Sequence, residues 1–129
     1  MTNQRNASPI VTVALIMMIS LHGIMLMALF AGVEPHPPAR VTPFGMAPFL
    51  AVVIGLSVVG IYLNSLGQAG AVYVAVAVAV LSLLSFGPQK YLDPAISQVW
   101  VAVVAAQVSA VLIVMELVQQ IMGRNHAAD

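Results

Sequence analysis

One acidic side chain lies within the last long apolar stretch of the chain. Glu116 is the only formally charged residue between Pro94 and Met122, and an ionised carboxylate inside a membrane span is costly enough to suggest proton or ion handling. Ser109 precedes it by seven residues and Gln120 follows it by four, so the three side chains share one face of a helix. Glu116 lies about 10 Å of helix before Gly123, which places it near the membrane interface. There it can also contact another subunit or reach headgroup water.

A histidine lies deep in the first apolar stretch. His22 is roughly 21 Å of helix from the start of that stretch. A buried neutral imidazole needs partners for both ring nitrogens, and Ser82 or Ser109, at comparable depth, is expected to supply one of them. The alternative is axial ligation of a haem or a chlorophyll-type pigment, because histidine is an axial ligand of such groups. His22 is the candidate cofactor-binding residue, and no other cofactor is implied.

Two short resemblances bear on these residues. The string His22-Gly23-Ile24-Met25 is similar to the His-Gly-x-x-Met string of haem–copper oxidase catalytic subunits. It covers four residues in a chain that lacks that family's other histidines, so the ligand role is not carried over. In size and expected helix count the chain resembles the small multidrug resistance family, which places its essential glutamate in the first helix. The first apolar stretch here contains no acid, so membership of that family is not inferred.

The other groups capable of chemistry lie in the proline-rich stretch between Gly32 and Pro43. Glu34, His36 and Arg40 lie there and form a weak candidate for a surface metal or docking site. The chain contains no Walker loop, GxSxG elbow, HExxH motif or paired carboxylate, and no cysteine. We therefore expect neither a self-contained enzyme nor a metal site built on thiolates.

Four apolar stretches must position these side chains. We expect transmembrane helices over residues 9–31, 44–66, 69–86 and 94–122. Ser8-Pro9 and Asp93-Pro94 have the pattern of a cap followed by proline at the first helical position, and Gly123 has the pattern of a helix end. Residues 71–80 alternate with period two, as in a strand, but a lone strand in lipid would leave its backbone unpaired. The predicted fold class is an all-α integral membrane protein, a four-helix antiparallel bundle with a tight hairpin between the second and third helices.

The composition supports this class. The chain of 129 residues is 61 % hydrophobic and only 6 % charged, whereas a soluble domain carries about 25 % charged residues. Its four basic and four acidic residues cancel, which removes the electrostatic case for binding nucleic acid. The first apolar run, residues 10–30, is longer than the h-region of a signal peptide, about 7–15 residues, so we expect it to be retained. The expected partners are the lipid bilayer and other transmembrane subunits.

The basic residues divide evenly between the two sides of the membrane. With four crossings, Arg5 and Arg124 share one side and Arg40 and Lys90 share the other, so the positive-inside rule favours neither orientation strongly. The N-terminal amine and the external character of the proline-rich link favour both termini in the cytoplasm. We expect an integral protein of a bacterial inner or internal membrane.

Small residues are the expected packing sites, because helices in lipid associate through close contact. The second helix offers Gly55, and the third and fourth each carry alanines at four-residue spacing: Ala71, Ala75, Ala79, Ala102, Ala106 and Ala110.

Three functions are compatible with this sequence. The first is a small non-catalytic, accessory subunit of a larger integral membrane complex, respiratory or photosynthetic in type. The second is a small oligomeric transporter or channel that uses Glu116. The third is a pigment-binding subunit that holds a haem or chlorophyll-type group through His22.

Overall fold

Helix α1 spans Pro9–Ala31 in a computed structural model that describes residues 6–32, 43–94 and 96–126. The Ser8 hydroxyl accepts a hydrogen bond of 3.4 Å from the Val11 N–H, and Pro9 occupies the first position, where its missing N–H has no acceptor in the helix. At the other end Gly32 has a φ of 63° and donates its N–H to the Ala28 carbonyl. Local sequence therefore determines both ends of α1.

A tight turn joins α2, Pro43–Ser65, to α3, Ala71–Phe86. The Gly67 N–H donates to the Asn64 carbonyl over 2.9 Å, and Gly67 has a φ of 64°, which requires glycine. The N–H of Ala71 is bonded to the Gln68 carbonyl over 3.1 Å, within the turn. For this reason α3 begins two residues later than the apolar pattern suggests.

The alternating stretch 71–80 is helical, and no strand occurs in the described ranges. The valine and alanine alternation therefore does not override the need to pair the backbone within one segment. The prediction of an all-helical chain is confirmed for these residues.

The connection into the last helix differs from the expectation. Residues expected to form a loop make a 3₁₀-helix, η1, Pro88–Leu92. The Asp93 N–H closes η1 on the Lys90 carbonyl, and the Asp93 carbonyl accepts the Ile96 N–H. Because Asp93 is engaged in this turn, α4 begins at Ile96 and not at Pro94. Helix α4, Ile96–His126, also continues through the expected end at Gly123, which is not among the glycines with positive φ.

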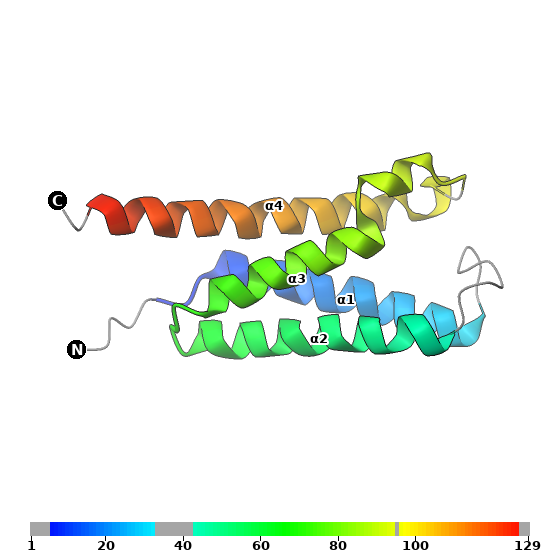
Figure 1. The fold of residues 1–129 in the computed structure, drawn as a ribbon, viewed down its shortest axis with the longest axis horizontal. Helices are drawn as coiled ribbons and strands as arrows, with labels where there is room; N and C mark the ends of the chain where they lie inside the picture. The colour runs from blue at the N-terminus through cyan, green and yellow to red at the C-terminus, as the bar shows by residue number, and fades with distance from the viewer. Residues whose placement is uncertain (1–5, 33–42, 95, 127–129) are drawn as a thin grey trace.

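By their contacts the four long helices form a ring, and Figure 1 shows them running along the length of the molecule. Helices α1 and α3 each contact both α2 and α4; α1 and α3 also touch across the middle, whereas α2 and α4 do not. The start of α1 lies against the end of α2, where Asn64 is hydrogen-bonded to Ser8. Figure 1 shows the start of α1 and the end of α4 at the same end of the molecule.

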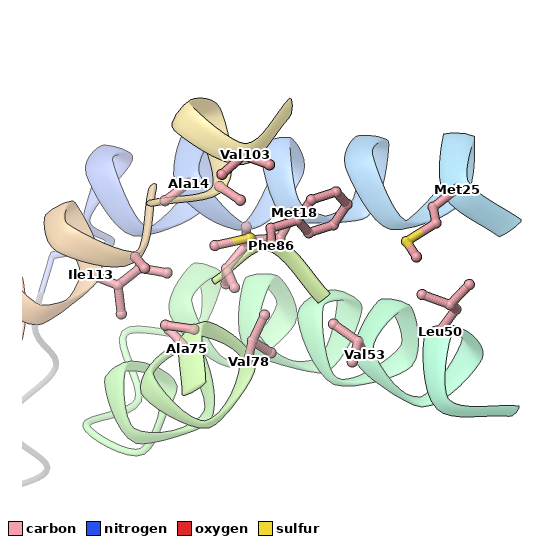
Figure 2. Packing of buried hydrophobic residues seen from close by; sticks show 14 of the residues in the cluster. Ala14, Met18, Met25, Leu50, Val53, Ala75, Val78, Phe86, Val103 and Ile113 are labelled. Carbon is pink, nitrogen blue, oxygen red and sulfur yellow. The ribbon is translucent and has the colours of Figure 1, made fainter. Parts of the chain in front are cut away.

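Apolar side chains from every long helix meet inside this ring. Figure 2 shows Ala14 and Met18 of α1 beside Phe86 of α3 and Val103 of α4, with Val53 of α2 nearby. Large apolar side chains also cover the outer faces, where Met27, Val52, Leu84 and Val111 are more than half exposed. Four segments are long and apolar enough to cross a membrane, the third being α3 together with η1, Ala71–Leu92, which identifies the chain as a membrane protein.

The expected packing residues divide into two groups. Most of the alanines are buried (Ala71, Ala75, Ala79, Ala106 and Ala110), and Ala102 packs at the edge of the core. Gly55 makes no close helix contact within this chain, because it is exposed and a Cβ there would meet no heavy atom within 4 Å. The close approach of α2 is five residues later, at Gly60, where a Cβ would lie 2.9 Å from Leu15 Cδ1.

Candidate functional site

His22 is completely buried in the second half of α1. Its Nδ1 lies 2.8 Å from the carbonyl oxygen of Met18, one turn earlier. Because a carbonyl oxygen can only accept, Nδ1 carries a proton, and Nε2 of the neutral ring presents a lone pair. The imidazole stands perpendicular to the Phe86 ring of α3, with ring centroids 5.3 Å apart and an interplanar angle of 88°. His22 therefore lies where α1 and α3 meet across the middle of the ring.

Two buried polar atoms at this interface have no hydrogen-bond partner within the described part of the protein: His22 Nε2 and Ser82 Oγ. Ser82 lies one turn before Phe86, on the same face of α3. The expected serine partner of His22 is thus not found, because Ser109 donates instead to the Ala105 carbonyl over 2.8 Å. A buried polar group without a partner costs about 1–3 kcal/mol, so this interface carries a local energetic cost.

The His22 ring has one feature of a metal ligand and lacks another. A hydrogen bond from one ring nitrogen to a backbone carbonyl commonly fixes the tautomer of a ligating histidine, and the bond to Met18 has this form. However, the ring is 0 % exposed and Phe86 packs against it, so a planar macrocycle has no approach to Nε2. Among the described residues, no group of three or more His, Cys, Asp or Glu side chains could hold a metal ion.

Glu116 is partly buried near the end of α4. Its Oε1 accepts a hydrogen bond of 3.4 Å from Gln120 Nε2, so two of the three polar side chains predicted to share one face of the helix are hydrogen-bonded to each other. Ser109 is not joined to them, because its hydroxyl is bonded to the backbone of its own helix. Glu116 lies about one turn after the core residue Ile113, in the second half of α4, whereas His22 lies in the second half of α1. The structure does not bring the two candidate residues together.

An apolar groove runs along the seam between α1 and α4. It consists of two adjoining cavities of about 460 and 350 Å³, which share Met17, Val101 and Ala105. We call this feature the α1–α4 groove. The smaller cavity extends along α4 to Leu112 and is lined by Trp100, the only tryptophan of the chain.

Polar side chains gather at one end of the α1–α4 groove. The larger cavity is lined there by Ser85, Lys90, Asp93 and Gln98, which lie at the end of α3, in and after η1, and in the first turn of α4. Lys90 Nζ lies 3.6 Å from Asp93 Oδ2, and both side chains are about one-third exposed. The groove therefore has a polar end that carries an ion pair and a long apolar remainder.

Sequence reasoning missed two side chains that hold the helices in place. Asn64 donates to the Ser8 carbonyl over 2.8 Å and to Thr12 Oγ1 over 2.9 Å, and its Oδ1 accepts the Ser8 N–H over 3.2 Å. Gln107 donates to the Phe86 carbonyl over 3.3 Å and accepts from the Tyr91 hydroxyl over 3.1 Å. A lone amide in an apolar helix was the available signal, because such a group in lipid needs a partner.

The residues of the proline-rich link, Glu34, His36 and Arg40, lie outside the described residues. The comparisons with known proteins add no further assignment: no family model, no curated protein and no solved structure matches this chain.

Proposed function

We propose that this chain is a small non-catalytic subunit of a larger integral membrane complex of electron transport. The observation that carries the proposal is the placement of its charges. Among the described residues, Lys90 and Asp93 lie in and just after η1, and Glu116 lies toward the end of α4. The buried polar residues include no Asp, Glu, Lys or Arg: they are His22, Ser57, Asn64, Ser82, Ser85 and Ser109. A bundle of this kind is suited to packing against neighbours and not to carrying ions across the membrane.

We further infer that the four helices cross the membrane as an antiparallel bundle in which α2 and α3 form a tight hairpin. The turn at Gly67 and the hydrogen bonds between Asn64 and Ser8 support this arrangement. The aromatic residues support it as well. Tyr62 and Tyr73 flank the turn, and Trp100 lies near the opposite end of the bundle, as expected for two interfacial belts. We place both termini in the cytoplasm of a bacterial cell.

The electron-transport class is favoured by the α1–α4 groove. The groove combines a long apolar section with a polar end, a lining that suits an amphiphilic cofactor. The outer faces of all four helices offer apolar surface for neighbouring subunits.

The transporter alternative would need Glu116 in a polar path through the bundle. Its carboxylate is instead bonded to Gln120 on the same helix, and the core residue Ile113 lies one turn before it. The pigment alternative would need Nε2 of His22 to be accessible, and that ring is buried against Phe86. Both observations favour the subunit role.

The test is to extract the protein from its native membrane in mild detergent, separate it on a native gel, and identify the co-migrating chains. Co-migration with a large redox or photosynthetic assembly is the expected result. A small homo-oligomer without partners would refute the proposal and would direct attention to proton flux in liposomes, with Glu116→Gln as the matched variant. A preparation that absorbs in the Soret or near-infrared region, and that His22→Ala bleaches, would establish the pigment alternative instead.

A further inference from the structure

The α1–α4 groove has a polar end and an apolar section about as long as one leaflet of a bilayer is thick. Along α4 it extends from Gln98 to Leu112, a separation of roughly 21 Å by the helix rise. The hydrocarbon core of a bilayer is about 30 Å thick, so one leaflet accounts for about 15 Å. The apolar section beyond this polar end, from Val101 to Leu112, is about 16 Å long by the helix rise, so it accommodates an apolar tail that reaches the middle of the bilayer.

The polar end of the groove is electrically balanced. Lys90 and Asp93 form an ion pair at 3.6 Å, so the two formal charges among the described residues that line this end cancel. An anionic phospholipid headgroup gains little from such a pair, because its phosphate is attracted by the lysine and repelled by the aspartate. A neutral headgroup with carbonyl oxygens suits the site better, since the Gln98 amide, the Ser85 hydroxyl and the Lys90 ammonium are hydrogen-bond donors.

We propose that the α1–α4 groove binds a quinone-class amphiphile. Its neutral carbonyl-bearing ring lies at the polar end, among Ser85, Lys90 and Gln98, and its polyisoprenoid tail follows the apolar section past Ala105 toward Leu112. The size of the groove accords with this ligand, because small-molecule sites have volumes of about 300–1,000 Å³, and the larger cavity alone measures about 460 Å³.

This inference deepens the proposed function, on which the choice of ligand partly rests, but the two fail separately. Quinone binding is a property of the purified chain and is measured without any partner. Membership of a complex is read from co-migration on a native gel and is independent of what fills the groove.

Trp100 provides the probe for the test. It is the only tryptophan, it lines the groove, and it lies two residues from Gln98. A quinone bound at the polar end is therefore close enough to quench its fluorescence. We expect decylubiquinone, added to the full chain in detergent micelles, to quench Trp100 saturably, with no displacement by an excess of phosphatidylglycerol.

Matched variants separate binding in the groove from partitioning into the micelle. Ala105→Phe fills the junction of the two cavities, whereas Ala77→Phe adds the same side chain at an exposed position on α3. We expect Ala105→Phe to weaken quenching at least tenfold and Ala77→Phe to leave it unchanged within twofold. Neither change alters the number of tryptophans.

A second pair covers the case in which Ala105→Phe loses its helical circular dichroism. Gln98→Leu removes an amide donor at an exposed position and Gln119→Leu makes the same change away from the groove; only the first is expected to weaken quenching. Quenching that rises linearly with quinone in the wild type, or equally in variant and control, would overturn the proposal. So would a solvent extract of the purified native protein that contains phospholipid and no quinone.

Discussion

Gly60 is the glycine of α2 that lies against neighbouring helices. A Cβ added there would lie 2.9 Å from Cδ1 of Leu15 in α1 and 3.5 Å from Cγ1 of Val74 in α3. The Leu15 side chain is 0 % exposed, so it must shift within a packed core to admit one methyl group. We expect Gly60→Ala to lower the free energy of unfolding.

The magnitude follows from two opposing terms. Replacing glycine by alanine inside a helix is worth about 1 kcal/mol in favour of alanine. Forcing an extra methyl into a packed core costs about 1–3 kcal/mol, so the net effect of Gly60→Ala lies between about 0 and 2 kcal/mol of destabilisation. Gly55→Ala is the matched control, because it lies on the same helix and its Cβ would meet no atom within 4 Å. The two variants are expected to differ by about 1–3 kcal/mol, which is the cost of the close approach alone.

The assay is unfolding in mixed micelles of rising dodecyl sulfate content, followed by far-ultraviolet circular dichroism. Wild type, Gly55→Ala and Gly60→Ala are compared at one protein concentration. Equal unfolding midpoints for the two variants would refute the assigned contact between α2 and α1. A midpoint for Gly60→Ala above that of Gly55→Ala would refute it more strongly, since it would mean that the methyl fills free space.

Three further changes can be measured in parallel. Asn64→Ala removes the three hydrogen bonds to Ser8 and Thr12 and is expected to cost about 2 kcal/mol in the same unfolding assay, since hydrogen bonds between membrane helices are worth about 0.6 kcal/mol each on average; an unchanged midpoint would contradict the contact. Ser82→Ala removes a hydroxyl without a partner and is expected to stabilise by about 1 kcal/mol, whereas the control Ser57→Ala, whose hydroxyl is bonded to its own helix, should not; a larger loss for Ser82→Ala than for Ser57→Ala would show that the hydroxyl is satisfied. Glu116→Gln is expected to weaken assembly on a native gel. We expect neither the wild type nor this variant to conduct protons in liposomes above the background of empty vesicles. A proton flux in the wild type that Glu116→Gln abolishes would support transport instead.

Local chemistry explains which helix ends could be predicted from sequence. The start of α1 follows from Ser8 and Pro9, and its end from Gly32, because each acts within one turn of the helix. The start of α4 did not follow from the same pattern at Asp93, because that residue is taken up by η1. A cap pattern therefore identifies a helix start only where no neighbouring turn uses the same backbone groups.

Close packing depends on which face of a helix meets a neighbour, and a spacing rule does not contain that information. Gly55 and Gly60 are both small residues in α2, but only Gly60 faces Leu15. The alanines of α3 were easier to place because Ala71, Ala75 and Ala79 repeat over two turns and so define a face. A single glycine defines none, and its role had to come from the structure.

The contact between His22 and Phe86 shows how the depth of a residue in the bundle can be predicted from its position in a helix once one tertiary contact is known. The hydrogen bonds between Asn64 and Ser8 place the start of α1 beside the end of α2, and α3 begins after a short turn at the same end. From there His22 lies 13 residues into α1 and Phe86 lies 15 residues into α3, depths of about 20 and 22 Å by the helix rise. Equal depth and a shared start bring both residues to one level of the bundle, and the faces that α1 and α3 turn toward each other there bring the imidazole and the phenyl ring into contact. Depth alone does not say which turn of α3 meets the imidazole, and this is why Ser82 was expected where Phe86, one turn later on the same face, is found.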